Sequence, residues 1–214
     1  MRWLQILFLI VGLNQSLLGQ VNFYRKLNSL HKLNLDSGIK LTFDEPSILK
    51  STKKTKIIIY ALPNGNTTVQ TFGKKLVEGE DWHFDIQHIG AQTQFIRNAD
   101  VNTNYIVVFA ENSLKSWPAW RKKFAKADEQ IDNIVADILK RYKKLKPKII
   151  LSGHSGGGSF IFGYINSQNQ IPSYVERIGF LDATYGYETE KHQAKLKNWL
   201  NNKNKFLQVI AYND

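Results

Sequence analysis

The chain has 214 residues, no cysteine, and a formal net charge of +11 at pH 7 from 29 Lys and Arg against 18 Asp and Glu. This length suits one domain with a sizeable core, and the lack of cysteine excludes disulfides, thiolate metal sites and a thiol nucleophile. The excess cations form either solvated surfaces or a field that attracts an acidic polymer or a membrane surface. They gather in four runs, at residues 50–56, 121–123, 140–148 and 191–205.

The first residues predict a secretory signal peptide, residues 1–19. Met1 and Arg2 form a basic tip, an apolar run extends from Trp3 to Leu13, and Gly19 is a small residue at a suitable cut site. The run is too short to span a bilayer, and a retained anchor is the alternative. Cleavage removes Arg2 and no acid, so the charge falls from +11 to +10. We therefore expect a secreted or periplasmic bacterial protein with no membrane span after cleavage, for which nucleic acid is not an expected partner.

Beyond the signal, apolar runs alternate with segments of helical period. Residues 20–54 are expected to be a lead-in, helical or irregular over 20–37 and with a possible edge strand at 39–43. Five buried strands are predicted from continuous apolar runs at residues 57–62, 105–110, 149–151, 178–181 and 206–212. Helices are predicted over residues 131–139, 160–165 and 187–201. This alternation indicates one α/β domain, with a mainly parallel sheet and helices on both faces.

A glycine-rich run, Gly153-His154-Ser155-Gly156-Gly157-Gly158, lies between the predicted strand at 149–151 and the helix at 160–165. It contains G-x-S-x-G in the strand-turn-helix context that lifts a serine hydroxyl above a sheet. Gly153 and Gly157 lack side chains, so the strand and the helix can approach closely around the serine. The run predicts Ser155 as a nucleophile on an elbow formed by Gly153, His154 and Gly157. The alternative is a glycine-rich turn with an ordinary serine.

With the order of strands around it, this motif resembles the α/β-hydrolase superfamily over residues 55–214. Tyr60 to Asn66 and Trp82 to Arg97 also resemble exported bacterial serine esterase-like hydrolases of that superfamily. The resemblance implies that the amide of Gly156 donates to the developing oxyanion, with a second amide from Asn64, Gly65 or Asn66. It implies no metal and no cofactor.

The superfamily order is serine, then acid, then histidine. Asp214 closes the last apolar run and is the first choice for the acid, while Asp182 closes the preceding run and is the alternative. His154 is expected to support the elbow, His192 lies inside a predicted helix, and the remaining histidines precede Ser155. We therefore expect a C-terminally truncated domain, whose final strand and histidine loop would lie beyond Asp214.

These features predict a secreted serine hydrolase that cleaves carboxylic esters through an acyl-enzyme on Ser155. A decorated polysaccharide is one candidate substrate, because four aromatic residues are available to stack on a sugar or an aromatic acyl group unless they pack in the core: Trp82, Trp117, Trp120 and Tyr185. The alternative is a hydrolase-fold module without a working triad, which binds an acidic polymer through its basic surface. The oligomeric state is not indicated.

Overall fold

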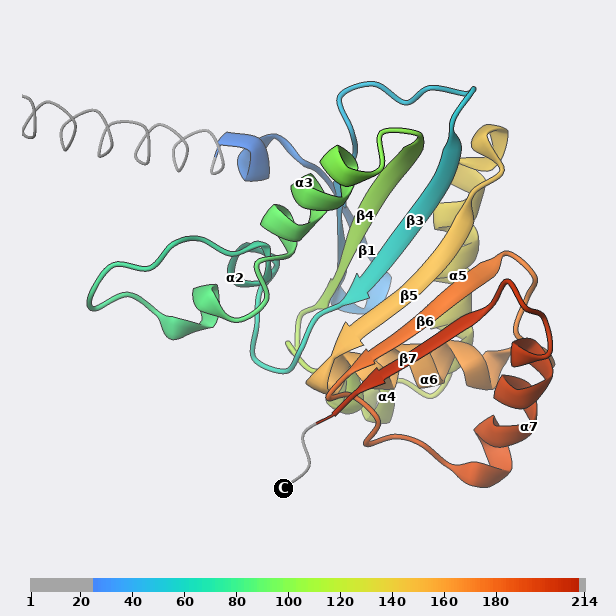
Figure 1. The fold of residues 1–214 in the computed structure, drawn as a ribbon. Coiled ribbons are helices and arrows are strands. Elements are labelled where there is room, and N and C mark those ends of the chain that lie inside the picture. The colour runs from blue at the N-terminus through green and yellow to red at the C-terminus, as the bar shows by residue number, and fades with distance from the viewer. Residues whose placement is uncertain (1–24, 212–214) are drawn as a thin grey trace, which may run out of the picture.

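The computed structural model describes residues 25–211, so the predicted signal peptide and Asp214 lie outside the described residues. A seven-stranded sheet organises the molecule, in the order β1-β2-β4-β3-β5-β6-β7 (Figure 1). Its strands are β1 (His31–Leu35), β2 (Ile39–Asp44), β3 (Lys54–Ala61), β4 (Thr103–Asn112), β5 (Lys148–His154), β6 (Val175–Leu181) and β7 (Phe206–Ile210). The strands β3 to β7 pair in parallel, whereas β1 and β2 are antiparallel to their neighbours. The mainly parallel sheet is confirmed.

The central strand β3 shows why the continuous apolar runs become buried strands. Its alternate residues Ile57 and Ile59 join the larger core on one face, and Tyr60 joins the smaller core on the other. A strand that is covered on both faces needs apolar side chains at successive positions. Each of the five predicted strands is present, with ends that differ by a few residues. The prediction that all five are buried was wrong for β7, whose Phe206, Val209 and Ile210 are exposed because β7 is the last strand at one edge of the described sheet.

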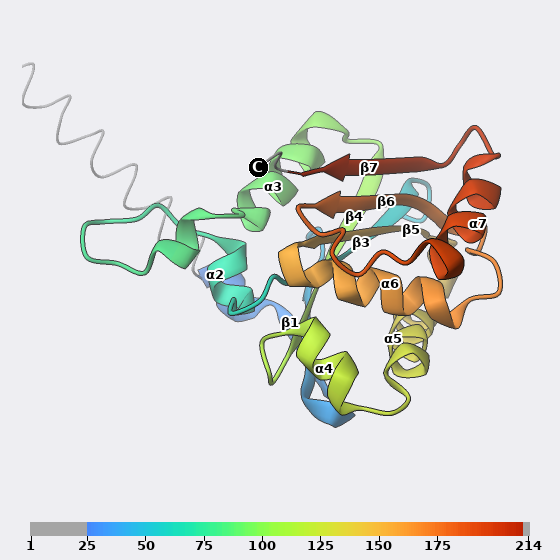
Figure 2. The same ribbon diagram turned by 90° about the horizontal axis from the view of Figure 1, so that it is seen from below.

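Helices cover both faces of the sheet, as predicted. Figure 2 shows α2 and α3 on one face and α4, α5, α6 and α7 on the other. Their bounds are α2 (Thr68–Phe72), α3 (Ile89–Ala99), α4 (Trp117–Lys123), α5 (Ala127–Arg141), α6 (Gly158–Ser167) and α7 (Thr189–Leu200). Short 3-10 helices occupy η1 (Asp36–Gly38), η2 (Trp82–Asp85), η3 (Lys143–Leu145) and η4 (Ser155–Gly157). None of the helices described between residues 25 and 211 is long and apolar enough to cross a membrane.

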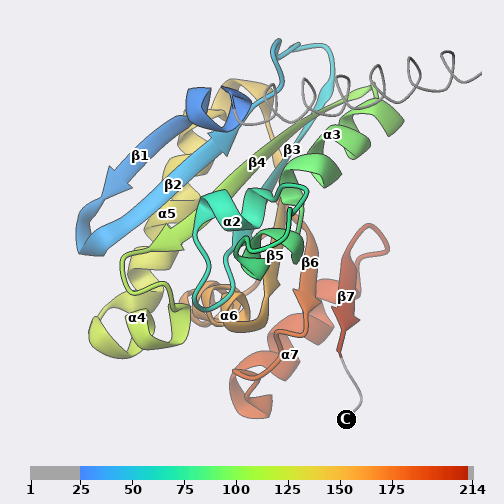
Figure 3. The ribbon, with the colours of Figure 1, turned by 90° about the vertical axis from the view of Figure 1, so that its left-hand side faces the viewer.

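The N-terminal lead-in contains two strands instead of the single edge strand expected. Residues 25–29 are helical, but the expectation of helical or irregular structure was wrong at β1. This strand has an exposed, polar sequence, HKLNL, and it forms through backbone pairing with β2, from His31 opposite Phe43 to Leu35 opposite Ile39. Pairing of this kind leaves little hydrophobic signal in the sequence. Figure 3 shows β1 and β2 side by side at one end of the sheet, with β7 at the other.

A buried ion pair ties the lead-in to the face that α3 covers. Asp44, at the end of β2, is fully buried and receives Arg97 Nη1 at 2.8 Å and Lys26 Nζ at 3.1 Å. The Arg97 guanidinium also donates to the backbone carbonyl oxygens of Asp44 and Tyr105, at 2.6 and 2.7 Å from Nη2. Arg97 lies in the last turn of α3, so this network fixes the C-terminal end of that helix. We call Lys26, Asp44 and Arg97 the ionic network.

The face of the sheet under α2 and α3 is not covered along its whole width. The smaller core, under α2 and α3, centres on β3 and β4, with Tyr60, Phe72 and Phe109 among its residues. On the same face the register places His154 of β5 beside Leu181 of β6, and Leu181 beside Ile210 of β7. Leu181 is half-buried, and Ile210 is 53% exposed. The carboxyl edge of this face is therefore open to solvent where β5 ends.

Candidate active site

Ser155 follows β5 directly and opens the 3-10 turn η4 that leads into α6. Its φ of 49° lies in the left-handed region, which is costly for a residue with a side chain. Such conformations persist where surrounding contacts impose them, and they are concentrated at functional sites. The strand-turn-helix context predicted for the glycine-rich run is confirmed.

The glycines of the elbow permit backbone contacts that a side chain would block. A Cβ atom at Gly153 would lie 2.8 Å from the carbonyl carbon of Gly157. One at Gly157 would lie 2.2 Å from the carbonyl oxygen of Ala61, and one at Gly158 would lie 1.8 Å from that of Ala183. The close approach predicted at Gly153 and Gly157 is therefore present, and Gly158 adds a third contact that the motif alone does not indicate.

The loop after β3 lies against the elbow. A Cβ atom at Gly156 would lie 2.0 Å from Asn64 Oδ1, so the Asn64 side chain packs on the Gly156 backbone. The N–H of Gly65 donates to the carbonyl of Lys115 at 2.8 Å, and the N–H of Asn66 to that of Pro63 at 3.4 Å. Within residues 25–211, the backbone N–H of Asn64 donates to no backbone carbonyl. The amide of Gly156 lies in the first turn of its helix, where amides lack an intrahelical acceptor.

A hydrogen-bonded chain of three side chains connects this loop to the elbow. Asn66 Nδ2 donates to Gln87 Oε1 at 3.2 Å, and Gln87 Nε2 donates to His154 Nδ1 at 2.8 Å. Asn66 and Gln87 are both buried. We call these three residues the amide network. Gln87 was not predicted, because its partners are far away in the sequence and only the fold brings them together.

The amide network determines which form of His154 is present. Its Nδ1 accepts from Gln87, so the neutral ring carries its proton on Nε2. Burial lowers the pKa of His154, an effect that the nearby negative charge of Asp182 opposes. In this arrangement neither ring nitrogen is free to take a proton from the serine. His154 positions the elbow and is not poised as a general base.

Asp182 follows β6 at the same edge of the sheet as the elbow. It adopts a φ of 44°, and its N–H donates to the carbonyl of Ile210 at 2.6 Å. Its carboxylate is close enough to affect the pKa of His154 electrostatically. Asp214 lies outside the described residues, so the choice between the two acids remains a prediction.

The other histidines are engaged away from Ser155. His192 is fully buried in α7, where its Nδ1 accepts from the N–H of Glu188 and its Nε2 donates to Asn166 Oδ1, both at 2.8 Å. Burial lowers its pKa. His83 and His88 bond to Asp81 and Asp85, at 2.5 and 2.7 Å. In the part of the chain that the structure describes, no hydrogen bond joins a histidine to Ser155, and no three acids or histidines cluster as a metal site.

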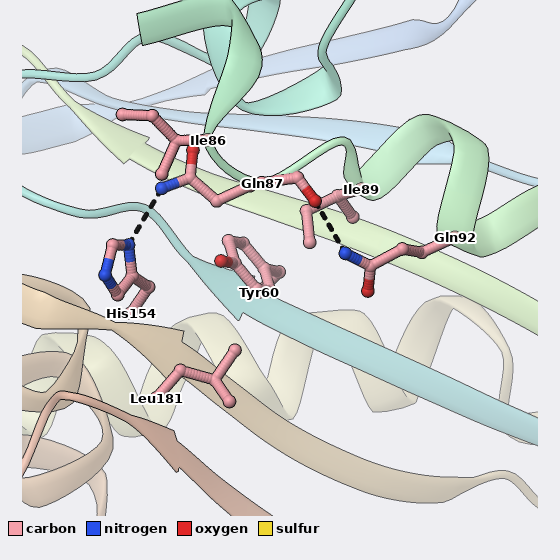
Figure 4. A pocket seen from close by; sticks show the side chains of 7 residues that line it. All are labelled: Tyr60, Ile86, Gln87, Ile89, Gln92, His154 and Leu181. Carbon is pink, nitrogen blue, oxygen red and sulfur yellow. Dashed lines mark hydrogen bonds between the residues drawn. The ribbon is translucent and has the colours of Figure 1, made fainter. Parts of the chain in front are cut away.

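A pocket of about 170 Å³ opens beside His154 (Figure 4). It is lined by Tyr60, Ile86, Gln87, Ile89, Gln92, His154 and Leu181. These residues come from the carboxyl ends of three adjacent strands and from the segment that begins α3.

The four aromatic candidates fall into two groups. Trp117 and Trp120 are buried against each other, with ring centroids 5.4 Å apart, so they are core residues. Trp82 is 65% exposed and stacks on His83, and Tyr185 is 74% exposed. Only the second group can meet a substrate at the surface.

Lysines from three of the four basic runs meet at the opposite edge of the sheet. They line a groove of about 640 Å³ with a single acid, Glu176, near the amino ends of β3 and β5. Lys56 pairs with that glutamate at 2.5 Å, and burial lowers the pKa of Lys205, helped by the charge of Lys148. We call this the lysine groove: Lys54, Lys56, Lys146, Lys148 and Lys205.

No family model and no curated protein matches the chain. Among solved structures, a thermostable esterase is similar with a TM-score of 0.53 and 11% identity, over 88% of this chain and 56% of that one. The chain thus spans little more than half of that esterase. Esterase 2 of Thermogutta terrifontis, phosphorylated by paraoxon, gives 0.49 and 10% over 87% and 83% of the two chains. Brefeldin A esterase, a bacterial protein, gives 0.41 and 16% over 79% and 43%.

Identities this low establish a fold and not an activity, and only the first likeness exceeds a TM-score of 0.5. The strand order and the serine turn after β5 point in the same direction as that likeness. The chain has an α/β-hydrolase fold.

Proposed function

We propose that this chain is a serine hydrolase that cleaves carboxylic esters through an acyl-enzyme on Ser155. One observation carries the proposal: Ser155 is held at a φ of 49° on a strand-to-helix turn, with the Asn64 side chain packed against the backbone of the next residue, Gly156. An ordinary glycine-rich turn has no need of this strained serine. The thermostable esterase of similar fold supports the same class of reaction.

In the proposed reaction, Ser155 Oγ attacks the acyl carbon while a general base takes its proton. The carbonyl oxygen becomes an oxyanion, to which the N–H groups of Gly156 and Asn64 donate. Collapse of the tetrahedral intermediate breaks the bond to the alcohol, which leaves with the proton held by the base. Water then attacks the acyl-enzyme by the same route and releases the acid and Ser155.

None of the histidines described within residues 25–211 is placed to act as the base, and Asp214 or Asp182 is the proposed acid. His154 accepts a hydrogen bond at Nδ1 and keeps its proton on Nε2, and His192 is buried with both ring nitrogens bonded, which argues against either acting as the base. We assign the second oxyanion donor to the backbone N–H of Asn64 and not to that of Gly65, because the Gly65 N–H already donates to the carbonyl of Lys115.

An exported enzyme acting on esters of a polysaccharide is the finer form of the proposal. The predicted signal at residues 1–19 supports export, and the exposed Trp82 and Tyr185 offer surfaces for a sugar or an aromatic acyl group. Neither feature is specific to one substrate.

A fluorophosphonate probe tests the catalytic role of the serine. The protein should form an adduct that maps by mass spectrometry to Ser155, and it should hydrolyse p-nitrophenyl acetate. The S155A variant, folded to the same extent by circular dichroism, should do neither. A folded wild-type protein that takes no label would defeat the enzyme proposal.

The lysine groove favours the second candidate, a non-catalytic module that holds an acidic polymer. Its five lysines and one glutamate give a concentrated positive charge, far along the sheet from Ser155. Replacing Lys146 and Lys148 with glutamine should weaken binding to an acidic polysaccharide column and lower the salt needed for elution. If the fluorophosphonate probe does not label Ser155 and these substitutions weaken polysaccharide binding, the results would support the non-catalytic binding module.

A further inference from the structure

The pocket beside His154 has a size and a lining that restrict what can enter it. Its volume of about 170 Å³ is slightly larger than the roughly 150 Å³ cavity that can hold benzene. Ile86, Ile89 and Leu181 supply apolar walls. No lysine or arginine lines it, and His154 is neutral, so nothing in the lining would balance a charged ligand.

A single hydroxyl in this pocket lacks a partner. Tyr60 is only 2% exposed, and its hydroxyl makes no hydrogen bond within the described part of the chain. Buried polar groups are almost always hydrogen-bonded, so each exception requires an explanation. The other buried side-chain oxygens without a hydrogen bond in residues 25–211 are those of Thr42 and Thr71 and Oδ2 of Asp44, which instead forms the ion pair with Lys26; none of these residues lines the pocket. In Figure 4 the Tyr60 ring lies between His154 and Gln92, with its hydroxyl on the His154 side.

Two polar neighbours of Tyr60 already make hydrogen bonds to other groups. Both ends of the Gln87 side-chain amide are used by Asn66 and His154, and Gln92 Nε2 donates to the backbone carbonyl of Gln87 at 2.6 Å. Burial raises the pKa of the Tyr60 phenol, so it keeps its proton and remains a donor. Among the described residues, the pocket therefore presents the Tyr60 hydroxyl as a buried donor without a partner, among apolar walls and beside the Nε2–H of His154.

We propose that this pocket receives one arm of the ester substrate, a neutral group about the size of a six-membered ring, whose oxygen accepts a hydrogen bond from Tyr60. The assignment rests on the proposed function, because the pocket adjoins the residue that precedes Ser155. It narrows the substrate class to esters with a compact, acceptor-bearing ring and excludes long unbranched chains and charged groups from this arm.

The test compares two ligands of the same shape in a protein that cannot turn them over. Methyl tetrahydropyran-4-carboxylate carries a ring oxygen, and methyl cyclohexanecarboxylate does not. Binding to S155A is measured by chemical-shift titration, with and without the second change Tyr60→Phe. We expect Tyr60→Phe to weaken binding of the ring-oxygen ligand about fivefold, the usual effect of one neutral hydrogen bond. The cyclohexane ligand should bind equally well to both proteins.

Equal affinity of the ring-oxygen ligand for both proteins would overturn the proposal. Tyr60→Phe should fold normally, since it removes only an unpartnered hydroxyl. A second variant, Leu181→Trp, fills the pocket from a half-buried position and should weaken both ligands; unchanged binding would also overturn the proposal. Because these titrations need no turnover, failure of the fluorophosphonate label would remove the esterase assignment and leave the pocket assignment standing.

Discussion

The ionic network and the amide network are both polar and buried, and they differ in charge and position. The ionic network is fully charged and lies where α3 covers the sheet, with Asp44 completely enclosed. The amide network is neutral and lies at the open carboxyl edge, beside the elbow. A buried charge must keep its partner, so the first network resists change. A neutral network can connect loops at a site without that penalty.

One helix connects the two networks. Arg97 lies in the last turn of α3, and Gln87 lies two residues before its first residue, Ile89. The 11-residue helix is about 16 Å long at 1.5 Å per residue. The ionic network thus fixes one end of a rigid element whose other end presents Gln87 to His154. If this comparison is right, damage to the first network should unfold the protein, and damage to the second should disturb the site.

The largest effect is expected from Arg97→Met, which removes the guanidinium and keeps most of the stem. It leaves Asp44 buried with only Lys26 nearby, and it should lower the free energy of unfolding by about 3–5 kcal/mol. Urea denaturation measures this. Lys126→Ala is the matched surface control, because its pair with Glu129 is exposed and should contribute less than about 1 kcal/mol. Similar losses in the two variants would contradict the role of the ionic network.

Gln87→Leu should have a smaller effect on stability and a clear effect at the elbow. It leaves the buried Asn66 side-chain amide without its acceptor and His154 Nδ1 without its donor. The free energy of unfolding should fall by about 1–3 kcal/mol. The nitrogen chemical shifts of His154 should then report a mixture of tautomers. Retention of a single Nε2-protonated form would show that Gln87 does not set the tautomer.

Acidification should destabilise the protein through His154 and His192. Burial lowers the pKa of both below the usual 6.5, so the unfolded chain binds more protons than the folded one below that pH. Their contribution to stability is complete above pH 6.5 and is lost as the pH falls toward the folded pKa values. Each can contribute at most about 1.4 kcal/mol per pH unit. Unfolding between pH 7.5 and 5 should show this slope, and His192→Gln should reduce it; an unchanged slope would exclude His192.

The smallest effect is expected from Asp182→Asn. The charge of Asp182 raises the pKa of His154, so its removal should lower that pKa further. Asparagine tolerates the positive φ at this position, so the fold should be preserved. An NMR titration of His154 measures the change, and a raised pKa would contradict it.

The strands and the elbow were predictable because their signals are local. Continuous apolar runs identify β3 to β7, and the glycines around Ser155 identify the turn. The strand β1 was not predictable in this way, since it forms through pairing and buries little. Gln87 was missed for a related reason: it lies 21 residues from Asn66 and 67 from His154, and no periodicity records such contacts. The hydrogen bonds of the buried His192 were not predictable either, because one of its partners, Asn166, lies on a different helix.

The contact between Gly157 and the carbonyl of Ala61 has a consequence for the order of folding. It joins residues that are distant in the chain, across the parallel pairing of β3 with β5. Long-range parallel pairing carries a high loop-closure cost and forms slowly. The strained turn at Ser155 cannot be held before that pairing is complete, so the nucleophile should acquire its geometry late. A chain that stalls before this step would have much of its secondary structure and no reactive serine.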